Sequence, residues 1–139
     1  MKHRWIQGKN DLADVDAIRH AVFVVEQGVS PVRVSDGDDS SLHLVLYDEG
    51  GAPIATGRLS ADFALQRIAV LRRERGKGKG ERVTRMLVEK ARQMGALRVT
   101  LSSQAHAIKF YEGLGFEICS DRYIDAGIVH VTMSMSLSS

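Results

Sequence analysis

The residues best suited to chemistry in this sequence form a glycine-rich basic segment near its middle, Arg75-Gly76-Lys77-Gly78-Lys79-Gly80. Glycines let backbone N–H groups turn toward a ligand and let the ligand approach closely. An amphipathic helix is expected directly after the segment, and the first N–H groups of a helix lack intrahelical acceptors and lie at its positive end. Lysine and arginine add full positive charges. Together these features predict a site for a phosphate or pyrophosphate group.

The spacing of the glycines narrows the class of phosphate ligand. The dinucleotide pattern G-x-G-x-x-G is not met, because the glycines here follow G-x-G-x-G, and the Walker pattern is absent as well. The pattern that is met is R-x-x-G-x-G, formed by Arg75, Gly78 and Gly80 between an apolar strand and an amphipathic helix. Taken alone, the segment also fits a flexible, solvated loop, so both interpretations stay open at this point.

The elements that must hold this segment follow from hydrophobic periodicity. An apolar run over residues 65–71 predicts a strand before the loop, and residues 81–94 predict a helix after it, with one apolar stripe and a closing Gly95. Strands are also predicted over residues 3–8, 42–47, 54–61, 97–101, 116–124 and 128–135, and helices over residues 12–26 and 105–114. Strands precede, separate and follow helices, which predicts an α/β class with a mixed sheet.

The composition of the chain sets the limits for these predictions. Its 139 residues, 44% hydrophobic and 26% charged, predict one globular domain over residues 1–139. Cys119 is the single cysteine, which excludes an intrachain disulfide and indicates a reducing compartment. No apolar stretch reaches the roughly 20 residues of a membrane span, so a cytoplasmic location is expected. The net charge of +2 is too small to indicate a nucleic-acid binder.

A second motif connects the glycine segment to a known family. The R-x-x-G-x-G pattern resembles the pyrophosphate signature of the GNAT acyltransferases, which use acyl-coenzyme A. The second signature of that family is resembled by the segment that follows the predicted helix and strand, Gln104-Ala-His-Ala-Ile-Lys-Phe-Tyr-Glu-Gly-Leu-Gly-Phe. Ile18-Arg-His-Ala-Val-Phe-Val-Val-Glu-Gln-Gly-Val-Ser and Asp125-Ala-Gly-Ile-Val-His are similar to the ElaA-like and YjcF-like branch, so the resemblance spans residues 18–135. Two positions depart from the family pattern: Lys79 is usually aliphatic, and Gln104 is often asparagine.

The resemblance implies a fold and a cofactor site. The fold is α/β (α+β), with a mixed, mostly antiparallel twisted sheet, a splayed central strand pair and about four flanking helices. The pantetheine arm of acetyl-CoA is expected to bind the backbone of the splayed strand as an added strand does. The residues implied in cofactor binding are Ile68, Ala69, Val70, Arg75, Gly76, Lys77, Gly78, Lys79, Gly80, Gln104, Phe110 and Tyr111.

Acyl transfer to an amine needs a base, a group that stabilises the oxyanion and an acid for the leaving thiolate. A backbone N–H near Ala69 or Val70 is the implied stabiliser. Tyr111 matches the family tyrosine that protonates the thiolate, and a phenol is neutral at pH 7 and able to donate. The base stays open between His130, whose side-chain type titrates near neutrality, Glu26, and a water chain to bulk solvent.

The resemblance therefore implies an N-acetyltransferase that moves an acetyl (acyl) group from acetyl-CoA to a primary amine of a small molecule or peptide through a ternary complex. No metal, nucleic acid or membrane is expected to take part, and a homodimer is an allowed assembly. A non-catalytic acyl-CoA-binding regulatory module remains the alternative. A nucleic-acid binder using the basic segment is a third hypothesis, against which the lack of interleaved aromatic residues argues.

Two further features are expected to be structural. Cys119 has no activating histidine or helix N-terminus in its sequence neighbourhood, so a half-buried strand thiol is expected. The acidic residues Asp36, Asp38 and Asp39 lack the twelve-residue calcium-loop pattern. They predict a solvated loop on the acceptor side, one that favours a cationic substrate.

Overall fold

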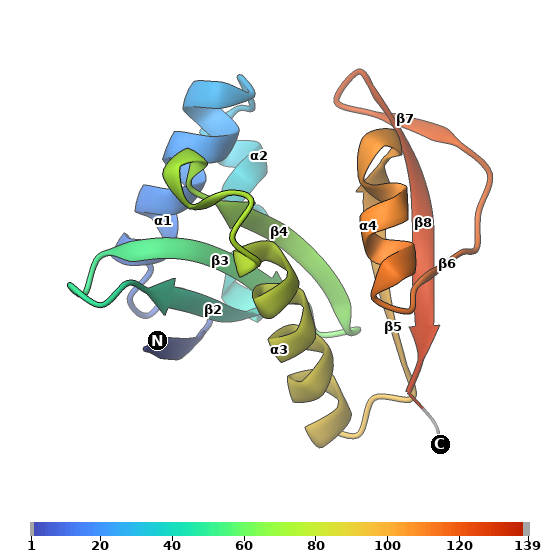
Figure 1. Ribbon diagram of the computed structural model, residues 1–139, viewed down its shortest axis with the longest axis horizontal. Coiled ribbons are helices and arrows are strands. Elements are labelled where there is room, and N and C mark those ends of the chain that lie inside the picture. Colours follow the sequence, from blue (N-terminus) through green and yellow to red (C-terminus); the bar gives the residue numbers. More distant parts are fainter. Residues whose placement is uncertain (1, 138–139) are drawn as a thin grey trace.

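The computed structural model describes residues 2–137 as a mixed sheet flanked by helices (Figure 1). The sheet has eight strands in the order β1-β2-β3-β4-β5-β8-β6, with β7 also paired to β8. All pairs are antiparallel except β4 with β5, which is parallel. The strands are β1 (His3–Gln7), β2 (Leu42–Tyr47), β3 (Pro53–Leu59), β4 (Ala64–Val70), β5 (Arg98–Gln104), β6 (Glu117–Ile118), β7 (Tyr123–Asp125) and β8 (Ile128–Ser136).

Helices cover both faces of the β1–β4 half of the sheet. Val45 packs with Val15 and Ile18 on one face, whereas its strand neighbours Leu44 and Leu46 pack on the other face, in the cluster that contains the long helix. This alternation along β2 gives each face of the sheet its own core. The strand pairings, together with the four α-helices of residues 2–137, confirm the predicted α/β class with a mostly antiparallel sheet. The helical elements are α1 (Ala13–Arg19), the π-helix η1 (His20–Glu26), α2 (Pro31–Ser35), α3 (Lys79–Gln93) and α4 (Ile108–Gly113), with the 3₁₀ turns η2 (Asp38–Ser40), η3 (Arg72–Glu74) and η4 (Ala105–Ala107).

A glycine in β3 lets the helix after the basic segment pack closely on the sheet. A Cβ atom at Gly57 would lie 2.8 Å from a methyl carbon of Val83 and 2.9 Å from one of Leu87. Both distances are shorter than carbon atoms tolerate, so any larger residue would push α3 away from the strand. The position of α3, and with it the position of the basic segment at its start, therefore depends on this contact.

The first predicted helix, over residues 12–26, changes its type in the middle. Residues 13–19 are α-helical and residues 20–26 form a π-helix. A π-helix has more residues per turn than an α-helix, so the apolar stripe read at α-helical spacing drifts away from the core. Val15, Ile18 and Val22 are buried as the stripe predicts, but Val25 is 69% exposed.

The two halves of the sheet separate between β4 and β5 (Figure 1). These strands pair at only two positions, Ala64 with Thr100 and Leu65 with Leu101. Beyond Leu65, β4 carries a β-bulge: Arg67 and Ile68 together face the single residue Gly57 of β3. Arg67 has a φ of 55°, in the left-handed region that non-glycine residues rarely adopt. The predicted splayed strand pair is therefore present, and it opens immediately after Leu65.

The strand predicted over residues 116–124 is two short strands, β6 and β7, both paired to β8. Between them the backbone N–H of Thr132 donates to the Oγ of Ser120 at 2.8 Å, so a side chain replaces the ladder carbonyl. The expectation for Cys119 is wrong, because this thiol lies in the interruption and is exposed, with Arg98 at 3.7 Å.

The expectation of a solvated acidic loop is also wrong at its central residue. Asp38 is 2% exposed and accepts hydrogen bonds from Arg19 at 2.9 and 2.6 Å and from Arg58 at 2.7 Å. Its backbone carbonyl lies 3.1 Å from Nε2 of the buried His43. Burial alone would raise the pKa of Asp38, but the hydrogen bonds and charge of Arg19, followed by the hydrogen bond from Arg58, lower it overall.

Candidate functional site

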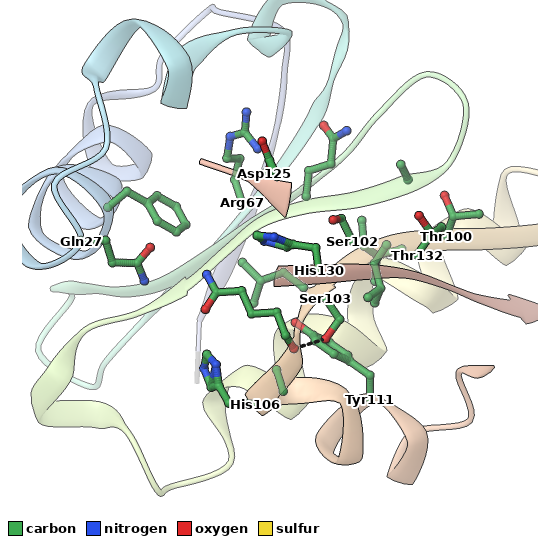
Figure 2. A pocket seen from close by; sticks show the side chains of 18 residues that line it. Gln27, Arg67, Thr100, Ser102, Ser103, His106, Tyr111, Asp125, His130 and Thr132 are labelled. Atoms are coloured by element: carbon green, nitrogen blue, oxygen red, sulfur yellow. Dashed lines mark hydrogen bonds between the residues drawn. The ribbon is translucent and has the colours of Figure 1, made fainter. Parts of the chain in front are cut away.

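A cavity of about 580 Å³ lies where β4 and β5 diverge (Figure 2). Its walls come from β4 and β5, from η4 and α4, from β7 and β8, and from η1. Polar side chains dominate the part between the strands, and the residues that later paragraphs use are Arg67, Ile68, Gln104, His106, Tyr111, Asp125 and His130. Among residues 2–137, no three His, Cys, Asp or Glu side chains are arranged to hold a metal ion.

The backbone of β4 directs polar groups into this opening. The N–H of Leu71 donates to the carbonyl of Ile54 on β3 at 3.0 Å. Because backbone groups alternate along a strand, those of Ala69 also face β3, whereas those of Ile68 and Val70 face the side where β5 has moved away. The open edge can therefore accept a strand-like ligand at Ile68 and Val70, but not at Ala69, whose predicted contribution is limited to its buried side chain.

The basic segment forms a turn with two left-handed glycines. Gly76 has a φ of 76°, and Gly78, the residue that precedes α3, has a φ of 80°. A Cβ atom at either position would meet no atom within 4 Å, so both glycines border open space. A Cβ atom at Gly80, in the first turn of α3, would lie 3.8 Å from side-chain atoms of both Phe110 and Val70. The start of the 15-residue α3 therefore presents unpaired N–H groups beside the open edge of β4.

Two predicted site residues pair with each other instead of standing free. The carboxylate of Glu26 accepts hydrogen bonds from both terminal nitrogens of Arg75 at 2.9 Å, and Arg72 lies at 3.3 Å. Arg75 also donates from Nε to the carbonyl of Val70 at 3.0 Å. The hydrogen bond from Arg75 lowers the pKa of Glu26, with the charges of Arg75 and Arg72 acting in the same direction. A carboxylate held in this way is a weaker base than a free one.

Tyr111 projects into the cavity from α4 (Figure 2). Its ring packs edge-on against Phe110, with centroids 5.0 Å apart, and against Phe116, with centroids 5.9 Å apart. Burial raises the pKa of Tyr111, so its phenol stays protonated at neutral pH. No side chain or backbone group in residues 2–137 forms a hydrogen bond with this hydroxyl, which leaves it available to a ligand in the cavity.

His130 lies on β8 in the middle of the same cavity and is 8% exposed. Its Nδ1 lies 2.8 Å from the carbonyl of Ile128, and because a carbonyl only accepts, Nδ1 carries the proton in the neutral ring. The ring also stacks on Tyr123, with centroids 6.0 Å apart. In this tautomer of the neutral ring, Nε2 is the acceptor. Gln104 pairs with His130 across β5 and β8, so both predicted residues lie in the same part of the wall.

Sequence reasoning missed several residues of the cavity wall, above all Arg67 and Asp125. Arg67 donates from Nε to the carbonyl of Val34 at 3.1 Å and from Nη2 to that of Arg33 at 3.0 Å. Asp125, from β7, forms an ion pair with the guanidinium of Arg33. A charged residue inside a run of residues 65–71 that is otherwise apolar except for Gln66 was the available signal for Arg67.

The chain was compared with family models, with known sequences and with solved structures, and the three comparisons agree with one another. Residues 16–137 match the family described as an acetyltransferase (GNAT) domain. The uncharacterized N-acetyltransferase YjcF of Bacillus subtilis (strain 168) is 33% identical over 138 residues, covering 96% of this chain and 98% of the relative. The crystal structure of an acyl-CoA N-acyltransferase from Pseudomonas aeruginosa has a TM-score of 0.85 at 24% identity, and Escherichia coli ElaA has 0.82 at 23%. Each covers 97% of this chain and is itself covered to 99%.

Proposed function

Because this chain belongs to the GNAT acetyltransferase family, in its ElaA-like and YjcF-like branch, and is an acetyl-CoA-dependent acyltransferase, we propose that it acetylates a primary amine by direct attack within a ternary complex. The observation that carries this proposal is the cavity between β4 and β5, which joins an open strand edge, a phenol and an imidazole. No helix in the described part of the chain is long and apolar enough to cross a membrane.

The cofactor half of the site begins at β4 and ends at α3. The pantetheine arm of acetyl-CoA pairs with the backbone groups of Ile68 and with the N–H of Val70, whose carbonyl already accepts from Arg75. The pyrophosphate binds over Gly76 and Gly78 against the first N–H groups of α3, where side chains would otherwise block the approach. Lys77 and Lys79 add charge there, and Gln104 and Phe110 border the same arm, from the β5 side and beside Gly80 respectively.

The chemical step follows from what each group can donate or accept. His130 takes the proton of the acceptor ammonium at Nε2, which frees the amine lone pair to form a C–N bond with the thioester carbonyl. The N–H of Val70 or Ile68 donates to the carbonyl oxygen as negative charge develops on it. As the C–S bond breaks, Tyr111 gives its proton to the sulfur. The attacking nitrogen loses its second proton as the tetrahedral intermediate collapses, and this proton restores the phenol of Tyr111. The products are an amide and the free thiol, and the proton on His130 returns to solvent.

Glu26 and Arg75 have a different part in this proposal from the one that the sequence indicates. Their ion pair joins the end of η1 to the turn that precedes α3. Arg75 acts by holding the carbonyl of Val70 and the shape of the turn, and Glu26 positions Arg75. The base is His130, because its Nε2 faces a cavity that a substrate can enter.

The test combines a binding and a turnover measurement. Isothermal titration is expected to show acetyl-CoA binding to the wild-type protein, and thiol release in the presence of amines reports transfer. Gly78→Glu puts a carboxylate at the anion site and is expected to weaken binding by about tenfold or more, as the loss of a charge-assisted contact does. Gly51→Glu is the matched control, because Gly51 also has a positive φ, 87°, and open space around it. Equal binding by the two variants, or none by the wild type, contradicts the proposal.

A further inference from the structure

One cation in the cavity wall has no anionic partner. Arg67 sits in the β-bulge of β4, and its guanidinium carries five N–H donors. Two of them are used, by the carbonyls of Val34 and Arg33 in α2. Within residues 2–137, Nη1 has no hydrogen-bond partner and no carboxylate lies within ion-pair distance of the group. At least three donors of a half-buried guanidinium are therefore left to whatever occupies the cavity.

The charges around Arg67 make this imbalance larger. Asp38, whose charge acts on Arg67, is already paired with Arg19 and Arg58, and Asp125 in the cavity wall is paired with Arg33. Burial, followed by the positive charges of Arg58, Arg19 and Arg33, lowers the pKa of Arg67. The wall on this side of the cavity consequently has an excess of positive charge. A ligand that brings a negative group would form charge-assisted hydrogen bonds with this half-buried cation.

We propose that the amine accepted by this enzyme also carries a carboxylate, which binds the free N–H donors of Arg67. This inference rests on the proposed function, since it concerns the acceptor of the same reaction. A planar guanidinium held in place by two backbone carbonyls presents its remaining donors in a fixed fork, which suits a carboxylate. The acceptor preference expected from the acidic loop is thereby reversed, because Asp38 faces inward and pairs with Arg19 and Arg58, whereas Arg67 in the cavity wall forms no ion pair within residues 2–137.

The experiment compares matched acceptors and matched variants. Amino acids with a free carboxylate are assayed beside the same molecules as carboxamides, and beside diamines, by thiol release from acetyl-CoA. For Arg67→Gln we expect kcat/KM on the acids to fall at least tenfold, whereas the amides change less than threefold. Arg67→Lys keeps the charge but loses the fork, so it should retain more acid activity than the glutamine variant. Arg98→Gln, an exposed arginine of β5 outside the cavity, is the control and should behave as wild type.

Each outcome decides between a carboxylate-binding role and a purely structural one. Arg67 also anchors α2, so thermal unfolding of every variant is measured beside activity. Equal losses in Arg67→Gln and Arg67→Lys, or equal losses on acids and amides, show an anchor and overturn the proposal. Preferred turnover of amides or diamines overturns it as well and leaves the proposed function intact. Acetyl-CoA binding without turnover of any acid also counts against it. If the proposed function itself is wrong, the wild-type protein does not bind acetyl-CoA. That result is distinguishable from every outcome that overturns only the carboxylate-binding role of Arg67.

Discussion

Replacing Asp38 by asparagine tests whether the buried charge cluster stabilises the fold. The wild-type carboxylate accepts three short hydrogen bonds from Arg19 and Arg58, and all three side chains are at most 4% exposed. The variant leaves the buried guanidinium of Arg58 without its ion-pair partner, and leaves Arg19 with Asp16 alone, at 3.0 Å. Removing one partner of a buried ion pair costs about 3–5 kcal/mol, which is a large part of the roughly 5–15 kcal/mol that stabilises a typical domain.

The assay is urea unfolding at a series of pH values. The folded-state pKa of Asp38 is lowered below its ordinary value, so the stabilisation that it provides is complete above the unfolded-state pKa of about 3.9. It is lost as the pH falls through the lower, folded-state pKa. The difference in free energy of unfolding between wild type and Asp38→Asn is therefore expected to be largest at neutral pH and to shrink in acid.

Asp39→Asn is the matched control, because Asp39 is the exposed neighbour of Asp38 in the same turn. Its effect on the free energy of unfolding should stay within about 0.5 kcal/mol. A loss in Asp38→Asn no greater than that of the control refutes the reasoning. So does a difference between wild type and Asp38→Asn that stays constant down to about pH 2, since the titration of Asp38 requires it to fall.

Two further predictions separate the roles of the cavity residues. Tyr111→Phe removes the proposed acid but keeps the ring that packs on Phe110 and Phe116, so kcat should fall by about a hundredfold with the acetyl-CoA affinity unchanged, measured by thiol release and isothermal titration. An unchanged kcat would reject this role. Glu26→Gln should keep most of the wild-type kcat, because the carboxylate is already held by Arg75; a loss as large as that of Tyr111→Phe would identify Glu26 as the base.

Local patterns in the sequence predict most of the fold. The strand over residues 65–71, the glycine segment and the helix over residues 81–94 correspond to β4, the turn and α3, because hydrophobic periodicity and helix-start chemistry act within a few residues. The π-helix η1 was not predictable from the same periodicity, since its change in winding leaves the residue types unaltered. The break between β6 and β7 depends on Ser120 meeting Thr132 and has no local signal either.

The parts of the site that the sequence did not predict depend on contacts between distant residues. Asp38 has acidic neighbours and looks solvated, but Arg19 and Arg58 meet it from 19 and 20 residues away, and only after the sheet has formed. In the same way, Glu26 and Arg75 lie 49 residues apart, and their pairing changes the expected role of each. A family motif identifies which residues belong to the site, but the charge that each presents there is set by these long-range partners.

The bulge in β4 places both halves of the proposed reaction on one strand. The extra residue at Arg67 and Ile68 shifts the register against β3, so that the backbone groups of Ile68 and Val70 face the opening while the side chain of Arg67 reaches α2 on the acceptor side. Arg67 and Val70 are three residues apart, about 10 Å along a strand. If one rigid strand both binds the thioester and holds the acceptor's carboxylate, the distance between the two reactants is fixed by the fold. A residue other than arginine at the bulge would then alter which amine is accepted without altering how the cofactor binds.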